Sequence, residues 1–319
     1  MFAYIFRRIA LSIPVLLAAS FIAFVSVRLA FDPTAKFRTL KDPTAVARAK
    51  KQFGLDQSIP VQWFKWLLRI FHGDFGISTR SGGRVWPEVI RSLGFTVQLI
   101  FWGVLLALAI SIAIGVYSAT KQYSVGDYLF TGLSYVGVAM PPFWFGLILI
   151  QVFGVYAKQH WGFQLFFVGL HSTDKSGINL DYIKHLILPV CTLAVQLVAE
   201  WSRFERSALL DVLSSEYVRT ARAKGLSRRR VIWKHAFRNS LTPLVTDVAT
   251  QAGTLFGGLI ITETIFSIPG MGRYTLQAIQ AGDVYAVVAA MFVAGAFVII
   301  FNLLSDLIYG LLDPRVRLA

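Results

Sequence analysis

The residues able to do acid–base, nucleophilic or metal chemistry are few and scattered along this chain. Its five histidines show no metal-ligand spacing, and its single cysteine, Cys191, excludes an internal disulfide and a thiolate cluster. No nucleophile arrangement is evident, and no stretch matches the phosphate-binding pattern G-x-x-x-x-G-K-[ST]. The sequence therefore predicts a protein that is not an enzyme, with no catalytic residue, metal site or cofactor site of its own.

The functional groups that stand out are charged side chains inside apolar stretches. Glu200, Arg203 and Asp247 interrupt two runs that are otherwise apolar. Charge within a membrane span is costly, so we expect these side chains to face a helix bundle or a wet cavity.

The elements that position these residues are predicted to be transmembrane helices. Residues with apolar side chains make up 55% of the 319, and the mean hydropathy is +0.61. Because a bilayer needs about 20 mostly apolar helical residues, charge-poor runs of that size mark candidate spans. Six such runs occur, at residues 9–27, 93–120, 128–157, 185–204, 241–262 and 284–305.

The first run could be mistaken for a secretory signal, since Arg7 and Arg8 precede it. We expect it to be retained, because it is long enough to cross a bilayer, no small-x-small cleavage site follows it, and more spans come after.

The net charge of +14 would suggest a nucleic-acid partner in a soluble protein. Beside membrane spans, basic residues instead meet anionic lipid and fix the topology. The strongly basic stretch between the fourth and fifth runs is therefore predicted to be cytoplasmic. Six spans then place both termini in the cytoplasm and the segment 31–93 outside, although that segment is also basic. In this topology Lys121 is cytoplasmic, whereas Lys50 and Lys175 are external.

The external segment contains an amphipathic pattern. Gln62, Lys65, Arg69 and His72 form one polar stripe, and aromatic and aliphatic residues fill the rest of residues 61–72. Such a helix fits the membrane interface or a packed position on neighbouring spans, and the sequence leaves both open.

The most informative stretch is EYVRTARAKGLSRRRVIWKHAFRNSLTP, residues 216–243. Ser214 or Ser215 can cap a first helix, Gly225 fits a left-handed helix end, and Ser227 can cap a second helix. A DNA-binding helix-turn-helix is the competing interpretation, but a stretch of about 40 residues joined at both ends to spans leaves no room for the small domain that such a motif needs.

This loop resembles the cytoplasmic coupling loop, the EAA motif, of binding-protein-dependent ABC importer permeases. The resemblance narrows to the B-type permease of peptide systems. It is carried by FGLDQSIPVQW (53–63), HGDFGIS (72–78), MPPFWFGLILI (140–150), ETIFSIPGMGR (263–273) and DLIYGLLDPRVR (306–317). The stretch RSLGFT at 91–96 departs from the family pattern, in which a proline usually precedes the threonine.

The resemblance implies an all-α fold of the ABC type I importer permease (MetI-like) architecture. Its parts would be a first helix (1–30), an external helical segment (31–93), a five-helix core (94–308) with the coupling loop at about 208–240, and a cytoplasmic tail (309–319). The implied ATPase-coupling residues are Glu216, Tyr217, Arg219, Thr220, Ala221, Ala223, Lys224, Gly225, Leu226 and Ser227.

The resemblance also implies a function in a bacterial inner membrane. The chain would move peptides inward by alternating access beside a homologous second permease, two ATPase subunits that bind ATP and Mg, and an external substrate-binding protein. Nickel, glutathione or another solute is an alternative cargo, and an ion-gradient-driven carrier or channel is an alternative class.

Candidate residues of the translocation path are Glu200, Arg203, Asp247 and Glu263. The carboxylates could attract the ammonium end of a peptide. Alternatively, Arg203 pairs with one of them as a structural ion pair.

Overall fold

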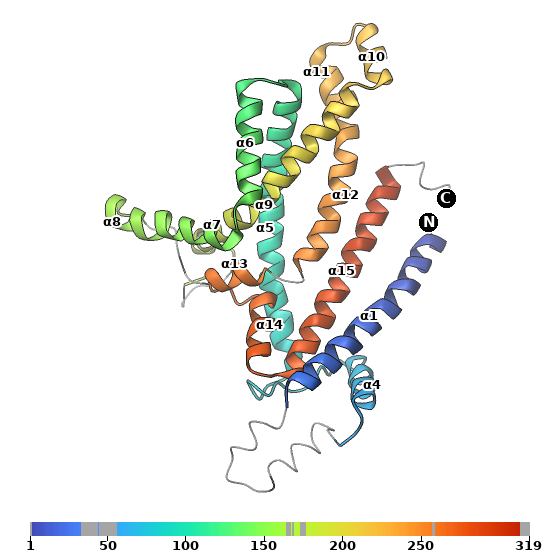
Figure 1. Ribbon diagram of the computed structural model, residues 1–319, viewed down its shortest axis with the longest axis vertical. Helices are drawn as coiled ribbons and strands as arrows, with labels where there is room; N and C mark the ends of the chain where they lie inside the picture. The colour runs from blue at the N-terminus through green and yellow to red at the C-terminus, as the bar shows by residue number, and fades with distance from the viewer. Residues whose placement is uncertain are drawn as a thin grey trace. The chain divides into compact units, whose positions relative to one another are not determined.

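The computed structural model describes residues 2–32, 44, 56–163, 167, 169–172, 177–256 and 259–312. Within this part of the chain the secondary structure is helical, and the one β-type pairing is the isolated bridge between Ile77 and Arg84. The helices begin with α1 (Phe2–Ala30), α4 (Ile59–Ile70), α5 (Val85–Thr120), α6 (Val125–Ala139), α7 (Pro142–Leu149), the π-helix η1 (Ile150–Tyr156) and α8 (Ala157–Trp161). They continue with α9 (Leu180–Leu213), α10 (Glu216–Ala223), α11 (Arg228–Arg230), the π-helix η2 (Val231–Ala236), α12 (Phe237–Leu255), α13 (Ile260–Ile265), α14 (Met271–Gln280) and α15 (Val284–Leu312). Figure 1 shows these helices along the chain.

Four of these helices are long and apolar enough to cross a membrane: α1, α5, α9 and α15. A fifth span results if the bent pair Val125–Ala139 and Pro142–Trp161 is counted as one. The predicted runs at 9–27, 93–120, 185–204 and 284–305 thus coincide with single helices. By length and hydropathy the described residues therefore contain four spans, or five with the bent pair, against the six that were expected, and the difference lies in the runs at 128–157 and 241–262.

The run expected at 128–157 is broken in the middle. Met140 has an extended backbone, with ψ 121°, and the chain bends by 106° before Pro142 begins α7. A residue that precedes proline is pushed out of the helical region, so the Met140-Pro141-Pro142 sequence stops α6. In Figure 1, α7 and α8 accordingly run across the direction of α6.

The run expected at 241–262 is shorter and more polar than expected. Helix α12 ends at Leu255, and a separate helix begins at Ile260. At about 1.5 Å per residue, the 19 residues of α12 are long enough to cross a membrane. Helix α12 is nevertheless not among the candidate spans, because it is too polar. Its polar residues are Arg238, Asn239, Ser240, Thr242, Thr246, Asp247, Thr250, Gln251 and Thr254.

The chain divides into two compact units. The first consists of Met1–Thr96, Phe256–Ile260 and Pro269–Ile300, and the second of Val97–Leu255, Ile261–Ile268 and Phe301–Ala319. The boundaries predicted at residues 30, 93 and 308 separate membrane-spanning segments from external and cytoplasmic ones, whereas these units are defined by packing. The predicted boundaries therefore stay a prediction. Lys50 and Lys175, whose external position was predicted, lie outside the described residues, as does the tail beyond residue 312.

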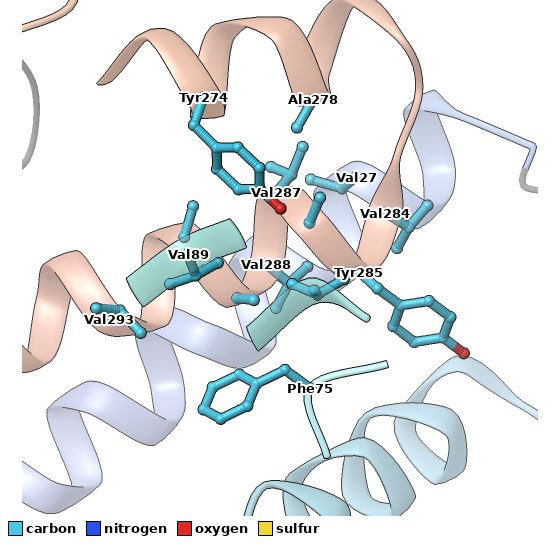
Figure 2. Packing of buried hydrophobic residues seen from close by; sticks show 14 of the residues in the cluster. Val27, Phe75, Val89, Tyr274, Ala278, Val284, Tyr285, Val287, Val288 and Val293 are labelled. Carbon is cyan, nitrogen blue, oxygen red and sulfur yellow. The ribbon is translucent and has the colours of Figure 1, made fainter. Parts of the chain in front are cut away.

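The core of the first unit is a cluster of small apolar side chains around the start of α15, together with residues of α1, α4, α5 and α14. Figure 2 shows Val284, Val287 and Val288 in this cluster, with the Tyr285 ring pointing out of it. Small β-branched and alanine side chains let the helix backbones approach closely, as is usual where membrane helices pack.

The predicted amphipathic helix of the external segment is α4 (Ile59–Ile70). Its buried side packs on α1, where the Trp63 indole donates to the Ser20 hydroxyl at 3.2 Å and Arg28 donates to Gln62 at 3.1 Å. Its opposite side leaves Phe64, Leu68 and Phe71 exposed. The helix therefore packs on a neighbouring helix and keeps an apolar face free, so the two interpretations left open by the sequence are compatible.

In the second unit α9 packs against α6 and α12. Between α6 and α9, Gly137 faces Ala199 so closely that a Cβ atom on the glycine would lie 2.8 Å from the alanine Cβ. The Arg206 guanidinium donates to both carboxylate oxygens of Asp127, each at 2.8 Å. Asp127 is almost fully buried, so this bidentate ion pair fixes α9 against the first turn of α6.

Candidate functional site

The stretch 216–243 forms two short helical segments joined by a tight turn, as predicted. Helix α10 is followed by α11 and the π-helix η2, which continue directly into α12. Ser215 and Ser227 occupy the N-cap positions with extended backbones, but neither side chain makes the capping hydrogen bond. The Ser215 hydroxyl instead donates back to the Val212 carbonyl at 2.6 Å, so the predicted side-chain caps are wrong.

Gly225 makes the turn in the left-handed conformation expected for it, with φ +78°. Its amide donates to the Arg222 carbonyl at 3.0 Å, and the Leu226 amide donates back to the Ala221 carbonyl at 3.4 Å. A Cβ atom on Gly225 would meet no heavy atom within 4 Å. The requirement for glycine here is therefore conformational and not a matter of space within this chain.

Four apolar residues seat this loop on the helices beneath it. Val218 and Ala221 of α10, with Val231 and Ala236 of η2, are buried. They form one cluster with Val116 and Ala119 at the end of α5 and with Leu209 near the end of α9. The loop is therefore a folded platform on the second unit and not a solvated tether.

The outer surface of the platform carries most of the residues predicted to couple to an ATPase. Those that are exposed are Glu216, Tyr217, Arg219, Thr220, Ala223, Lys224, Gly225 and Ser227. Glu216 pairs with Arg219 at 2.9 Å on the same exposed side, and the Asn239 amide donates to the Tyr217 hydroxyl at 2.7 Å. Of the predicted set, Ala221 is buried and Leu226 half-buried, so these two hold the loop in place.

A pocket of about 460 Å³ opens beside the platform. It is lined by the end of α5, the end of α9 and the start of η2. The Arg228 guanidinium donates to the Thr120 carbonyl at 2.9 Å, so the first arginine of the RRR run is attached to the last residue of α5. Arg229 and Arg230 remain exposed.

The structure brings together two of the four predicted path residues. The Gln251 side-chain amide donates to Glu200 and to Asp247, each at 3.0 Å, and accepts from the Trp201 indole at 3.2 Å. Glu200 is exposed, which leaves its carboxylate accessible. Two carboxylates thus share one amide between α9 and α12.

The structure does not place Arg203 with these carboxylates. Its guanidinium lies over the Tyr135 ring at 4.8 Å, and its Nε donates to the Ala199 carbonyl at 3.2 Å. Among the described residues no ion pair joins Arg203 to Glu200 or Asp247, so the predicted structural pairing is wrong. A long side chain on a helix points back along its own helix, and here the adjacent α6 offers an aromatic face instead.

Glu263, the fourth path candidate, is fully buried in α13. Its backbone carbonyl accepts from the Ile268 amide at 2.8 Å, which closes the turn after that helix.

Two buried charged sites beside the platform were not predicted from the sequence. One is the Asp127–Arg206 ion pair, and the other is Glu205, which is fully buried and accepts from the Ser240 hydroxyl at 2.8 Å. Both lay just outside the apolar runs, at residues 127 and 205 beside run ends placed at 128 and 204. The sequence does contain a helix-start signal next to Asp127, because the Ser124 hydroxyl accepts from the Asp127 amide and caps α6. Nothing in the sequence specifies that Asp127 pairs with Arg206, 79 residues away.

This chain is similar to known transport proteins. The model of the binding-protein-dependent transport system inner membrane component family matches residues 111–318, and the model of its N-terminal region matches residues 1–100. A solved structure titled as an amino acid ABC transporter with histidines superposes with a TM-score of 0.50 over 70% of this chain and 93% of that chain. At 13% identity this likeness concerns the fold alone.

Three curated relatives are similar over nearly their whole length. The oligopeptide transport system permease protein AppB of Bacillus subtilis is 38% identical over 323 residues, covering 99% of this chain and 100% of the relative. The dipeptide transport system permease protein DppB of Escherichia coli K12 is 35% identical, and the oligopeptide transport system permease protein OppB of Mycobacterium tuberculosis is 36% identical, each with 99% of both chains covered.

Proposed function

This chain belongs to the family of binding-protein-dependent transport system inner membrane components, and we propose that it is the transmembrane permease subunit of an ATP-driven ABC importer of peptides. Peptide as the cargo is supported by relatives at 35–38% identity that carry dipeptide or oligopeptide permease names. The chain itself would be a non-catalytic, multi-pass subunit of the bacterial inner membrane, with both termini in the cytoplasm. ATP and Mg would be bound by partner ATPase subunits.

The observation that carries the mechanism is the seated platform formed by α10, Gly225 and η2. It presents a polar, exposed surface while Val218 and Ala221 hold its underside on α5 and α9. A surface that docks on a moving partner must be rigidly attached to the helices that it is to move, because a flexible tether would absorb the displacement. We propose that this surface docks on an ATPase subunit and transmits ATP-driven closure to the spans.

Passage of the peptide would occur between this chain and a homologous second permease, by alternating access. The paired carboxylates of Glu200 and Asp247 offer a negatively charged patch that suits the ammonium end of a peptide, because Glu200 is exposed and Arg203 does not neutralise it. Glu263 stays a candidate by its position in the matched segment 263–273.

The experiment is reconstitution of the complete importer from this permease, its partner permease, two ATPase subunits and the substrate-binding protein. ATP-dependent uptake of a labelled peptide into proteoliposomes, stimulated by the loaded binding protein, is the expected result. The variant Glu200→Gln with Asp247→Asn should lower uptake of a peptide with a free amino end more than that of its N-acetylated form. Uptake that is independent of ATP would contradict the importer function.

A further inference from the structure

A second polar pocket lies in the first unit. It has a volume of about 530 Å³ and is built around the HGDFGIS segment, a motif that the coupling mechanism does not use. The side chains that give it its chemistry are those of Arg69, His72, Asp74, Arg84, Trp86 and Tyr285.

The loop that forms this pocket is fixed in place by its own hydrogen bonds. The Ser78 hydroxyl donates to the buried Asp283 carboxylate and accepts from the backbone amides of Arg80 and Ser81. Gly76 packs so tightly on Tyr285 that a Cβ atom would lie 2.9 Å from that ring. The pocket is therefore preformed, and a ligand would not have to order it.

The lining of the pocket favours an anion. Two arginines, Arg69 and Arg84, line the pocket against one carboxylate residue, Asp74. The Arg69–Asp74 contact is 4.0 Å between side chains that are 41% and 53% exposed, so it is a weak ion pair that a second carboxylate can replace. In addition, the Nε of Arg69 is enclosed and makes no hydrogen bond within the described residues.

Aromatic rings supply the walls. Phe75 and Trp86 are stacked at 4.3 Å between centroids, and the Arg69 guanidinium lies 5.5 Å over the Tyr285 ring. Arginine, tryptophan and tyrosine at the centre of a preformed pocket are the residue types that dominate binding energy at protein interfaces. A planar guanidinium also matches a carboxylate in a bidentate manner, which an ammonium group cannot do.

We propose that this pocket receives an aspartate or glutamate side chain of the external substrate-binding protein. The proposal rests on the proposed function, which supplies the binding protein and places the segment 31–93 outside. The position along α5 supports that side of the membrane. Trp86 lies in the first turn of this 36-residue helix, whereas Val116 and Ala119, which seat the coupling platform, lie in its last two turns. The two ends of a helix that crosses the bilayer are on opposite sides.

The test uses the complete importer in nanodiscs and the purified binding protein, with Arg84→Gln as the variant. Arg84 is exposed, so its neutral replacement should leave the fold intact. We expect the Kd of the binding protein to rise at least tenfold and to depend less on salt. The matched control is Lys65→Gln, which removes one charge from the exposed side of α4 without altering the pocket lining and should change the Kd less than twofold.

The possible outcomes separate this inference from the proposed function. An unchanged Kd for Arg84→Gln, or an equal loss for Lys65→Gln, would overturn the pocket as the docking site. A third outcome would be that labelled peptide binds the importer in the absence of the binding protein, and that Arg84→Gln abolishes this binding. The pocket would then be a peptide site, and the proposed docking of the binding protein would be overturned. Basal ATPase activity of the wild-type assembly tests the proposed function alone. If this activity is absent, both the proposed importer function and the docking proposal that rests on it are overturned.

Discussion

Gly225 allows the coupling mechanism to be tested with a perturbation whose local cost is known. Its φ of +78° lies in the left-handed region, where an L-residue costs about 1–2 kcal/mol and a β-branched side chain is especially unfavourable. A Cβ atom there meets nothing within 4 Å, so Gly225→Val adds strain but no clash within the chain. The turn geometry should then become less populated by a factor of about 5 to 30.

The residues that seat the platform, Val218, Ala221 and Val231, are buried and lie outside the turn itself, so the substitution removes none of their side chains. We therefore expect Gly225→Val, and more strongly Gly225→Glu, to insert in normal amounts yet lose transport, because the angle and surface offered to the ATPase change. Gly225→Asn should retain most activity, since asparagine tolerates the left-handed conformation.

The assay is peptide uptake per ATP hydrolysed in proteoliposomes, together with the amount of ATPase subunit that co-purifies. The matched control is Gly162→Val, because Gly162 has φ +70° and equally open surroundings but ends α8, away from the platform. Normal uptake by Gly225→Val at normal expression would refute the coupling role of this turn, as would an equal loss in Gly162→Val.

Three further predictions concern ATP hydrolysis, the Asp127–Arg206 ion pair and the membrane topology. The chain purified alone should show no ATPase activity above background in a phosphate-release assay, whereas the full assembly should. Arg206→Leu should lower the unfolding free energy by about 3–5 kcal/mol, because it leaves Asp127 buried without its partner, and adding Asp127→Asn should restore part of it, as read from thermal unfolding in detergent. Single cysteines at Lys121 and Arg229 should be labelled only after the membrane is opened, and one at Lys50 in intact cells.

The sequence predicted best those features that depend on a local pattern. The four long apolar helices followed from hydropathy alone, since any segment of that length and composition is helical in a membrane. The turn at Gly225 followed from a glycine placed after a run of good helix formers, because few other residues adopt a positive φ.

Features that depend on competition between neighbours were predicted less well. The break after Met140 was available in the two consecutive prolines, but apolar composition on both sides of them suggested one continuous run. The serine caps failed for a similar reason: Ser215 has a competing acceptor, the Val212 carbonyl three residues earlier, and the sequence does not say which bond is made.

Contacts between segments that are distant in the chain could not be predicted from the sequence. Nothing local indicates that Asp127 meets Arg206, or that Gln251 rather than Arg203 joins Glu200 to Asp247. These pairings are decided by how α6, α9 and α12 pack, and a single sequence contains no record of that packing.

One turn of α9 connects the coupling platform to three other helices, and this bears on how a displacement of the platform would travel. Leu209 lies in the seat under α10, and four residues earlier Glu205 accepts from Ser240 of α12. Glu205 also packs on α5, where a Cβ atom on Gly115 would lie 2.7 Å from its own Cβ.

The neighbouring residue extends this connection to α6. Arg206 binds Asp127 through two hydrogen bonds, so residues 205–209 touch α5, α6, α10 and α12 within about 6 Å of helix length. Tightly packed contacts of this kind shift together and do not deform separately. We infer that a movement of α10 is passed to α5, α6 and α12 through this one turn. The coupling residues would then include the buried Glu205 and the half-buried Arg206 as well as the exposed surface of the loop.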